Sequence, residues 1–100
     1  MGEQEKKLEM KIKVPESLMG GVYANNVIIS HTKEEFIITF TMMTPPQGIV
    51  TSRVIMSPSH TKRLASALQE NIKKYETTIS TIPPVSDPKE RIGFHIADNP

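Results

Sequence analysis

The stretch of the sequence best suited to chemistry is "SPSHTKRL", residues 57–64. Ser57 followed by Pro58 is typical of a helix start, where unpaired backbone N–H groups can bind an anion. Basic side chains in and before this stretch add positive charge, so a nucleic-acid phosphate is one candidate ligand. The simpler interpretation is a solvated basic turn. The residues of this predicted anion contact are Arg53, His60, Lys62 and Arg63.

Catalysis and metal binding have weaker support. Ser57 and Ser59 lie beside His60, a pairing that could activate a hydroxyl, but Ser57 is better used as a helix cap and no orienting acid lies nearby. His31, His60 and His95 form no His-x-x-x-His spacing, and His31 is expected to close a hairpin. There is also no phosphate-binding Gly loop. We therefore expect no enzyme, no catalytic residue, no metal site and no cofactor.

Asn25 and Asn26 raise a different question, because they interrupt the apolar segment "GVYANNVIIS". Paired asparagines in a strand can mark a β-bulge, and an asparagine can also adopt a left-handed backbone conformation. The other interpretation is contact with a polar ligand. A structural role is favoured, since short polar side chains bond readily to nearby backbone.

The composition limits the classes of function. The chain has 100 residues, enough for one domain, with 37% hydrophobic residues, 5% aromatic residues and no Trp. This lean supply of core side chains makes self-association worth considering. The net charge of +1 is smaller than that of most nucleic-acid-binding proteins, so nucleic acid ranks behind protein as a partner.

The sequence also predicts a location. It has no cysteine, which excludes disulfides and fits the reducing cytoplasm. The first residues, "MGEQEKKLEMK", lack the apolar centre of a signal peptide. No apolar run reaches the roughly 20 residues needed to span a bilayer. We therefore expect a cytoplasmic protein without membrane contacts.

Hydrophobic patterning predicts the elements that must position these residues. Apolar and polar residues alternate in four segments, 8–14, 22–30, 36–43 and 49–56, which predicts four strands. The loop "TPPQG" should turn the chain between the last two, because its two prolines cannot donate to a strand ladder and Gly48 can take a positive φ. A helix is predicted over 58–78, with an apolar stripe formed by Leu64, Leu68, Ile72, Tyr75 and Ile79.

Strands followed by a helix favour an α+β fold. The expected architecture is an antiparallel sheet of three to four strands, then one long amphipathic C-terminal helix and an extended tail. Residues 1–7 are expected to be a disordered N-terminus, 8–80 a single domain, and 81–100 a Pro-rich linker with an apolar tail. The helix stripe should cover the sheet face that carries Phe36, Ile38, Phe40 and Met42.

A set of motifs within residues 18–76 gives a resemblance. The segments are Tyr23–Asn25, Ser30–Thr32, Glu35–Phe36, Ser52–Ile55, Pro58–Leu64 and Ala67–Glu76. In this order they resemble a small bacterial family, the domain of unknown function 3467 (DUF3467). The loop "TPPQG" departs from that pattern, because it is shorter and less basic than the family's connection. The resemblance implies no activity.

The second face of the predicted sheet also carries apolar residues, which is typical of an interface. Packing of two copies about a two-fold axis is favoured over a tail that folds back and covers this face. The expected surface for a second copy, or for an unidentified protein partner, consists of Ile37, Met43, Ile55, Ile92, Phe94 and Ile96.

Three hypotheses for function follow. The first is a non-enzymatic homodimeric protein-interaction module, whose tail can add to a sheet edge. The second is weak nucleic-acid binding through the basic helix start. The third is a binder of unfolded chains similar to the export chaperone SecB, an analogy of layout only.

Overall fold

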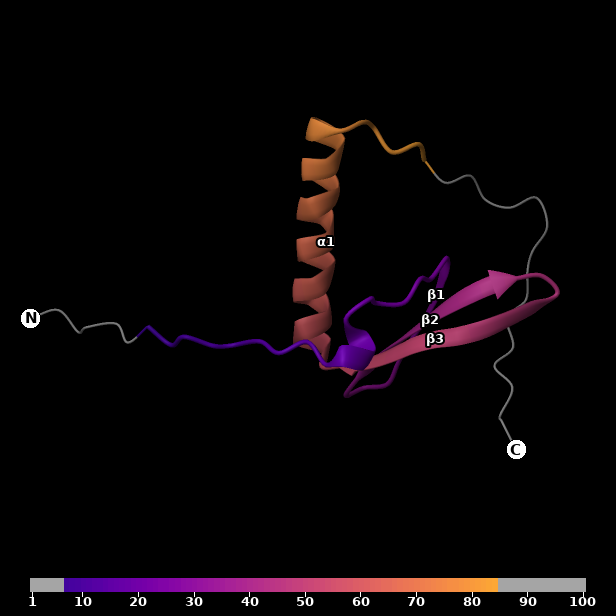
Figure 1. The fold of residues 1–100 in the computed structure, drawn as a ribbon, viewed down its shortest axis with the longest axis horizontal. Coiled ribbons are helices and arrows are strands. Elements are labelled where there is room, and N and C mark those ends of the chain that lie inside the picture. The colour runs from indigo at the N-terminus through magenta and orange to yellow at the C-terminus, as the bar shows by residue number, and fades with distance from the viewer. Residues whose placement is uncertain (1–6, 85–100) are drawn as a thin grey trace, which may run out of the picture. The chain divides into compact units, whose positions relative to one another are not determined.

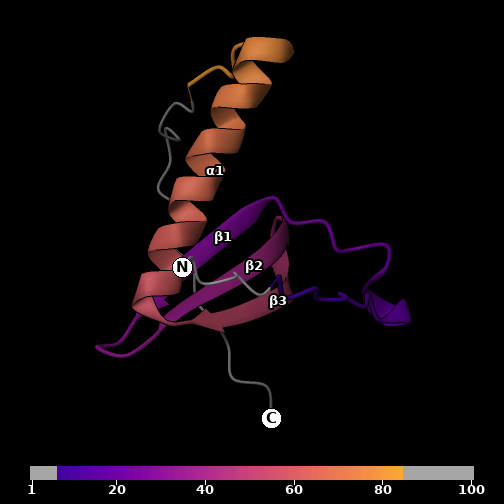
Figure 2. The same ribbon diagram turned by 90° about the vertical axis from the view of Figure 1, so that its left-hand side faces the viewer.

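The computed structural model describes residues 7–84, which form three strands and one long helix. The elements are the 3₁₀ turn η1 (Glu16–Leu18), β1 (Asn26–His31), β2 (Phe36–Thr44), β3 (Gln47–Met56) and α1 (Pro58–Thr78). The strands form one antiparallel sheet in the order β1-β2-β3, as Figures 1 and 2 show. The chain divides at Arg63 into two compact units, and each is described by itself. The predicted α+β fold is confirmed, with three strands and the helix in their expected order.

Residues 8–14 differ from the prediction, because they form no strand. The alternating side chains Leu8, Met10 and Ile12 are between 84% and 89% exposed. A strand requires a neighbour that pairs with its backbone N–H and C=O groups. The alternating pattern supplies a face to bury but not that neighbour, so the predicted strand is wrong for the single chain.

The hairpin between β1 and β2 is closed by local contacts. The backbone N–H of Thr32 donates to the carbonyl of Glu35 at 2.8 Å. The Thr32 hydroxyl accepts from the N–H groups of Glu34 and Glu35 at 3.2 and 3.1 Å. His31 lies directly opposite Phe36, and their rings stack with centroids 5.3 Å apart. The prediction that His31 closes this hairpin is therefore confirmed.

The hairpin between β2 and β3 turns through Pro45 and Pro46, joined by a cis peptide bond, with Thr44 and Gln47 paired on either side. Gly48 does not use the positive φ open to it, since Gly21, at 71°, is the one glycine with a positive φ among residues 7–84. Gly48 lies opposite Met43, and a Cβ atom there would meet the end of the flexible Met43 side chain, which can shift.

The side chains of Asn25 and Asn26 form hydrogen bonds to β2. The Asn25 amide donates to the carbonyl of Met43 at 3.0 Å, and its Oδ1 accepts from the Met43 N–H at 2.7 Å. The Asn25 side chain thus satisfies the Met43 N–H and C=O groups as the backbone of a paired strand would, one residue before β1 begins. The Asn26 amide donates to the hydroxyl of Thr41, its cross-strand partner, at 3.1 Å. The structural interpretation is confirmed, although neither asparagine has a positive φ.

The β-bulge lies elsewhere. The register between β2 and β3 shifts between Phe40 and Thr41, so that Thr51 is an extra residue on β3. The hydroxyl of Thr51 donates to the carbonyl of Phe40 at 3.2 Å. A bulge disrupts the ladder locally, and this side chain supplies a hydrogen bond at that point.

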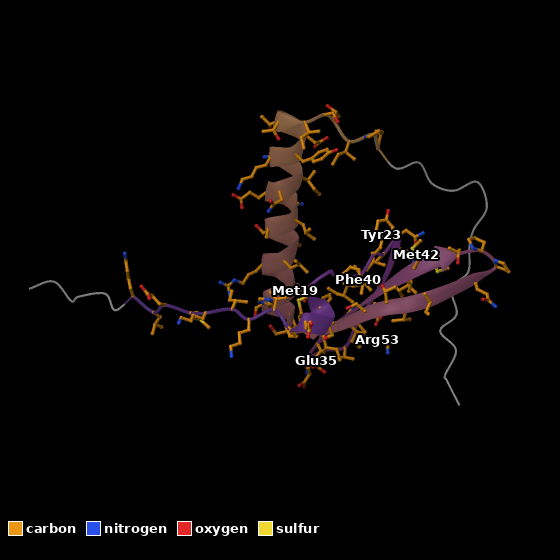
Figure 3. The ribbon with its side chains drawn as sticks, viewed as in Figure 1. Met19, Tyr23, Glu35, Phe40, Met42 and Arg53 are labelled. Atoms are coloured by element: carbon orange, nitrogen blue, oxygen red, sulfur yellow. The ribbon has the colours of Figure 1, made fainter. Side chains whose placement is uncertain are left out.

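The register assigns alternating residues to two faces of the sheet. Figure 3 labels Phe40 and Met42 on one side and Arg53 on the other. The apolar residues of the first side, the Phe40 face, are Val27, Ile29, Phe36, Ile38, Phe40, Met42, Ile49, Val54 and Met56. Those of the second side, the Arg53 face, are Ile28, Ile37, Met43, Val50 and Ile55.

The core of the sheet is confined to its central strand. Ile38, 5% exposed, is the one buried apolar side chain among residues 7–84. The buried Thr39 and Thr41 are its neighbours on β2, and each hydroxyl has a cross-strand partner. The sheet is therefore held by backbone pairing and polar side chains more than by apolar burial.

Replacing Asn25 by Ala should destabilise the sheet, because both bonds to the Met43 backbone are lost. At roughly 0.5–1.5 kcal/mol for each hydrogen bond, discounted for exposure, we expect a loss of about 1 kcal/mol. Urea unfolding followed by circular dichroism at one protein concentration measures it. Asn25→Asp is the matched variant: it keeps the acceptor but loses the donor, so it should also be destabilised. Wild-type stability in both variants would contradict the assigned role.

Candidate functional site

The helix start offers few free donors. The Ser57 hydroxyl accepts from the backbone N–H of His60 at 3.2 Å, which confirms Ser57 as the N-cap. The N–H and the hydroxyl of Thr61 both donate to the Ser57 carbonyl, at 3.0 and 2.9 Å. Pro58 has no N–H, so Ser57 and Ser59 supply the two uncommitted N–H groups of the helix start in the described part of the chain. An anion would find at most two backbone donors here.

The basic side chains of the predicted anion contact do not converge. On a helix of 3.6 residues per turn, His60 and Lys62 are about 200° apart, whereas His60 and Arg63 share a side. All three are exposed. Arg53 lies on the sheet, where its Nε donates to the Thr39 hydroxyl at 3.1 Å. The structure therefore places Arg53 in a cross-strand pair and distributes the other three around the first turns of α1.

The pairing of Arg53 with Thr39 was missed by the sequence prediction. Thr39 is 2% exposed and lies directly opposite Arg53. A buried hydroxyl without a partner would be costly, and the guanidinium removes that cost. The alternating pattern placed both residues in strands, but only the register puts them opposite each other.

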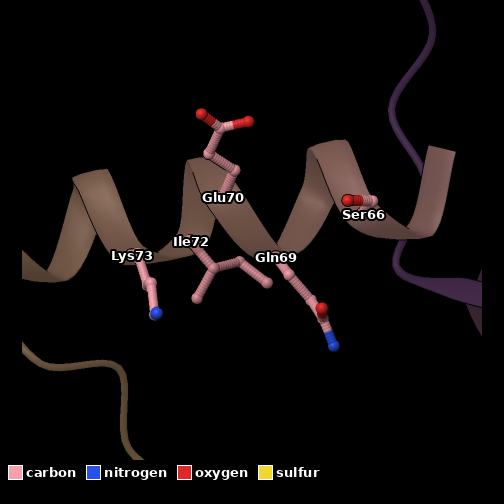
Figure 4. A pocket seen from close by; sticks show the side chains of 5 residues that line it. All are labelled: Ser66, Gln69, Glu70, Ile72 and Lys73. Atoms are coloured by element: carbon pink, nitrogen blue, oxygen red, sulfur yellow. The ribbon is translucent and has the colours of Figure 1, made fainter. Parts of the chain in front are cut away.

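One depression occurs on the surface of α1. It has a volume of about 640 Å³ and is lined by Ser66, Gln69, Glu70, Ile72 and Lys73, all from the helix (Figure 4). Within residues 7–84 no cluster of three or more His, Asp or Glu side chains has a geometry that could hold a metal ion. A depression lined by one helix does not enclose a substrate, so it is a poor candidate for an active site.

Exposed apolar side chains are the more extensive feature of the described chain. On the Arg53 face, Ile37 lies directly opposite Ile55, and Met43 and Val50 are on the same side. The structure thus places the three sheet residues of the predicted partner surface on one face, with Met43 six residues along β2 from the Ile37–Ile55 pair. Ile92, Phe94 and Ile96, the remaining three, lie outside the described residues.

The Phe40 face is also open. Val27, Ile29 and Val54 on this face are exposed, and Phe36, Phe40 and Met42 are only half-buried. The sequence prediction had not assigned this face to a partner, because the helix was expected to cover it. These residues are recognised as one surface only from the register of β1 and β3 against β2, which places them on the same face.

The apolar stripe of α1 is exposed as well. Leu68, Ile72, Tyr75 and Ile79 are 42–68% exposed, and no residue of α1 is buried. The expected packing of this stripe on the sheet stays a prediction, because the stripe and the sheet belong to different compact units. Apolar side chains on both sheet faces and on the helix are exposed at least in part, which is typical of an interface.

Comparison with known proteins gives the family. The model of a family described as "Protein of unknown function (DUF3467)" matches residues 1–83. The chain belongs to the DUF3467 family. Its domain includes residues 8–14, the sheet and the helix, whereas residues 84–100 lie outside the match. No curated protein and no solved structure matches the chain significantly.

Within the described part of this DUF3467 chain, no helix combines the length and the apolar character that crossing a membrane requires. α1 has 21 residues, but it carries charged and polar side chains on most of its circumference.

The N-cap can be tested separately from any binding. Ser57→Ala removes the acceptor for the His60 N–H and should destabilise the protein by about 1 kcal/mol. Ser66→Ala is the matched control, because Ser66 is exposed within α1 and lies away from the cap. Thermal unfolding by circular dichroism distinguishes the two. Equal effects of both substitutions would contradict the cap.

Proposed function

We propose that this DUF3467 chain is a non-enzymatic homodimeric protein-interaction module. The observation that supports it is the imbalance between buried and exposed apolar side chains. Ile38 is the one buried apolar side chain among residues 7–84, while both sheet faces and the helix stripe carry exposed apolar side chains. Exposed apolar surface on this scale is typical of an interface.

The free energy of folding supports the same proposal. Complete burial of one side chain of this size contributes about 1.5–3 kcal/mol. Ordering one residue of backbone costs roughly 1–2 kcal/mol. The half-buried side chains of β2 supply part of the remainder, and covering the exposed apolar side chains in a dimer would add to the stability of the fold.

A second copy is the partner that satisfies this requirement most simply. It carries the same apolar surfaces at the same concentration, and a two-fold axis lets one patch bury its own equivalent. Coverage by a different protein is the other way to satisfy it. The absence of cysteine supports a cytoplasmic location within this proposal.

Nucleic-acid binding ranks second. The exposed His60, Lys62 and Arg63 favour it, but their spread around the helix and the engagement of Arg53 with Thr39 reduce the charge that one phosphate would meet. The analogy to SecB has no specific contact in its favour. The proposal includes no enzymatic activity, and the depression on α1 is lined by residues of one helix only.

Multi-angle light scattering tests the proposed dimer. The full chain should have twice the 11.2 kDa mass of one copy, and a chain ending at Ile82 should have twice its own, smaller monomer mass, because sheet and helix surfaces are retained. A monomeric truncation would assign the interface to the tail. Monomers in both cases, with a cooperative unfolding transition, would contradict the homodimer and point to a different partner protein.

A further inference from the structure

The apolar residues on the exposed side of α1 follow a heptad spacing. Ala65, Leu68, Ile72, Tyr75 and Ile79 are separated by three, four, three and four residues. This is the spacing at which two helices pack along a shared seam. The Ile79 N–H donates to the Tyr75 carbonyl at 2.8 Å, so the helical turn continues to the last of these positions.

The charged residues beside this seam would pair with their opposites on a second copy of the helix that runs in the opposite direction. Lys62 and Glu76 occupy the same flank of the seam, two heptads apart, with Gln69 midway between them. If two helices run antiparallel about a two-fold axis near Gln69, Lys62 lies beside Glu76 of the partner subunit, and the reverse contact forms as well. In a parallel pair these two residues would be about 21 Å apart along the axis.

The side-chain sizes agree with the antiparallel arrangement. It places Ala65 opposite Tyr75 of the partner subunit and Leu68 opposite Ile72 of the partner subunit. Pairing a small residue with a large one fills the seam evenly. A parallel pair would instead place Ala65 opposite itself and Tyr75 opposite itself, which leaves a gap at one level and crowding at another.

We propose that α1 pairs with α1 of a second copy as an antiparallel two-helix seam, with Lys62 and Glu76 as reciprocal charge contacts. The proposal rests on the proposed homodimer, because two heptads are too short to hold a free-standing coiled coil. The seam therefore acts together with the sheet surfaces, and it sets the direction in which the copies meet. Glu76 also accepts the Ile82 N–H through Oε2 at 2.9 Å, so one of its carboxylate oxygens is engaged within the chain.

The lack of native cysteine makes cross-linking of single-cysteine variants a clean test. Gln69→Cys places a thiol beside its own equivalent, so a short bismaleimide should link it into a dimer in the full-length protein. Lys62→Cys and Glu76→Cys should each fail to cross-link alone but should cross-link when mixed. Glu70→Cys is the matched control, because Figure 4 shows Glu70 projecting away from the side that carries Gln69 and Ile72.

The outcomes separate this proposal from the homodimer. A dimer by light scattering without a Gln69→Cys cross-link would overturn the helix seam and leave the homodimer intact. Equal cross-linking of the Gln69→Cys and Glu70→Cys variants would also overturn it, because that result indicates random collision. A monomer by light scattering would contradict the proposed function and the seam together.

Charge reversal gives an independent readout. Lys62→Glu and Glu76→Lys should each weaken self-association on the order of ten-fold, since each creates two like-charge contacts in the dimer. The double variant Lys62→Glu with Glu76→Lys should restore it, and Glu70→Lys should have no effect. Sedimentation equilibrium measures all four. A double variant no stronger than the single variants would overturn the reciprocal contact.

Discussion

The shortage of apolar burial is the constraint on which the rest of this structure depends. Among residues 7–84 a single apolar side chain, Ile38, is buried, although every strand carries an apolar face and the helix carries an apolar stripe. A chain of this length has little surplus stability even when its core is complete. Under the proposed function, covering these faces adds to the stability of the fold, so the proposed interaction and the folded state are linked through the same surfaces.

Polar contacts determine the geometry of the sheet. The Asn25 amide pairs with the Met43 backbone, and the hydroxyls of Thr39 and Thr41 accept from Arg53 and Asn26. Hydrogen bonds are directional, whereas apolar contact is not, so these pairs can specify a register without a large core. This leaves both apolar faces of the sheet free for a partner without loss of strand alignment.

At the start of α1, helix capping and anion binding would compete for the same backbone N–H groups. The N–H donors that could bind an anion are the donors that a stable helix must satisfy. Here Ser57 takes the His60 N–H, and Pro58 removes another donor. In residues 57–64, the stretch predicted to bind an anion, the hydroxyl of Ser57 and the N–H of His60 are therefore used to cap α1. The far larger apolar surface carries the stronger functional argument.

The sequence by itself determined the elements whose causes are local. Ser57 and Pro58 start the helix at the predicted residue, the Pro45-Pro46 loop separates two strands, and alternation assigns Ile37 and Met43 to one face of β2, whereas the register adds Ile55 to that face. Only the tertiary structure decided which residues lie opposite each other, the bulge at Thr51, and the partner of Asn25, 18 residues away. It also left residues 8–14 without a neighbour. The reason is physical: caps and turns depend on adjacent residues, whereas strand pairing depends on a second segment that a local pattern does not specify.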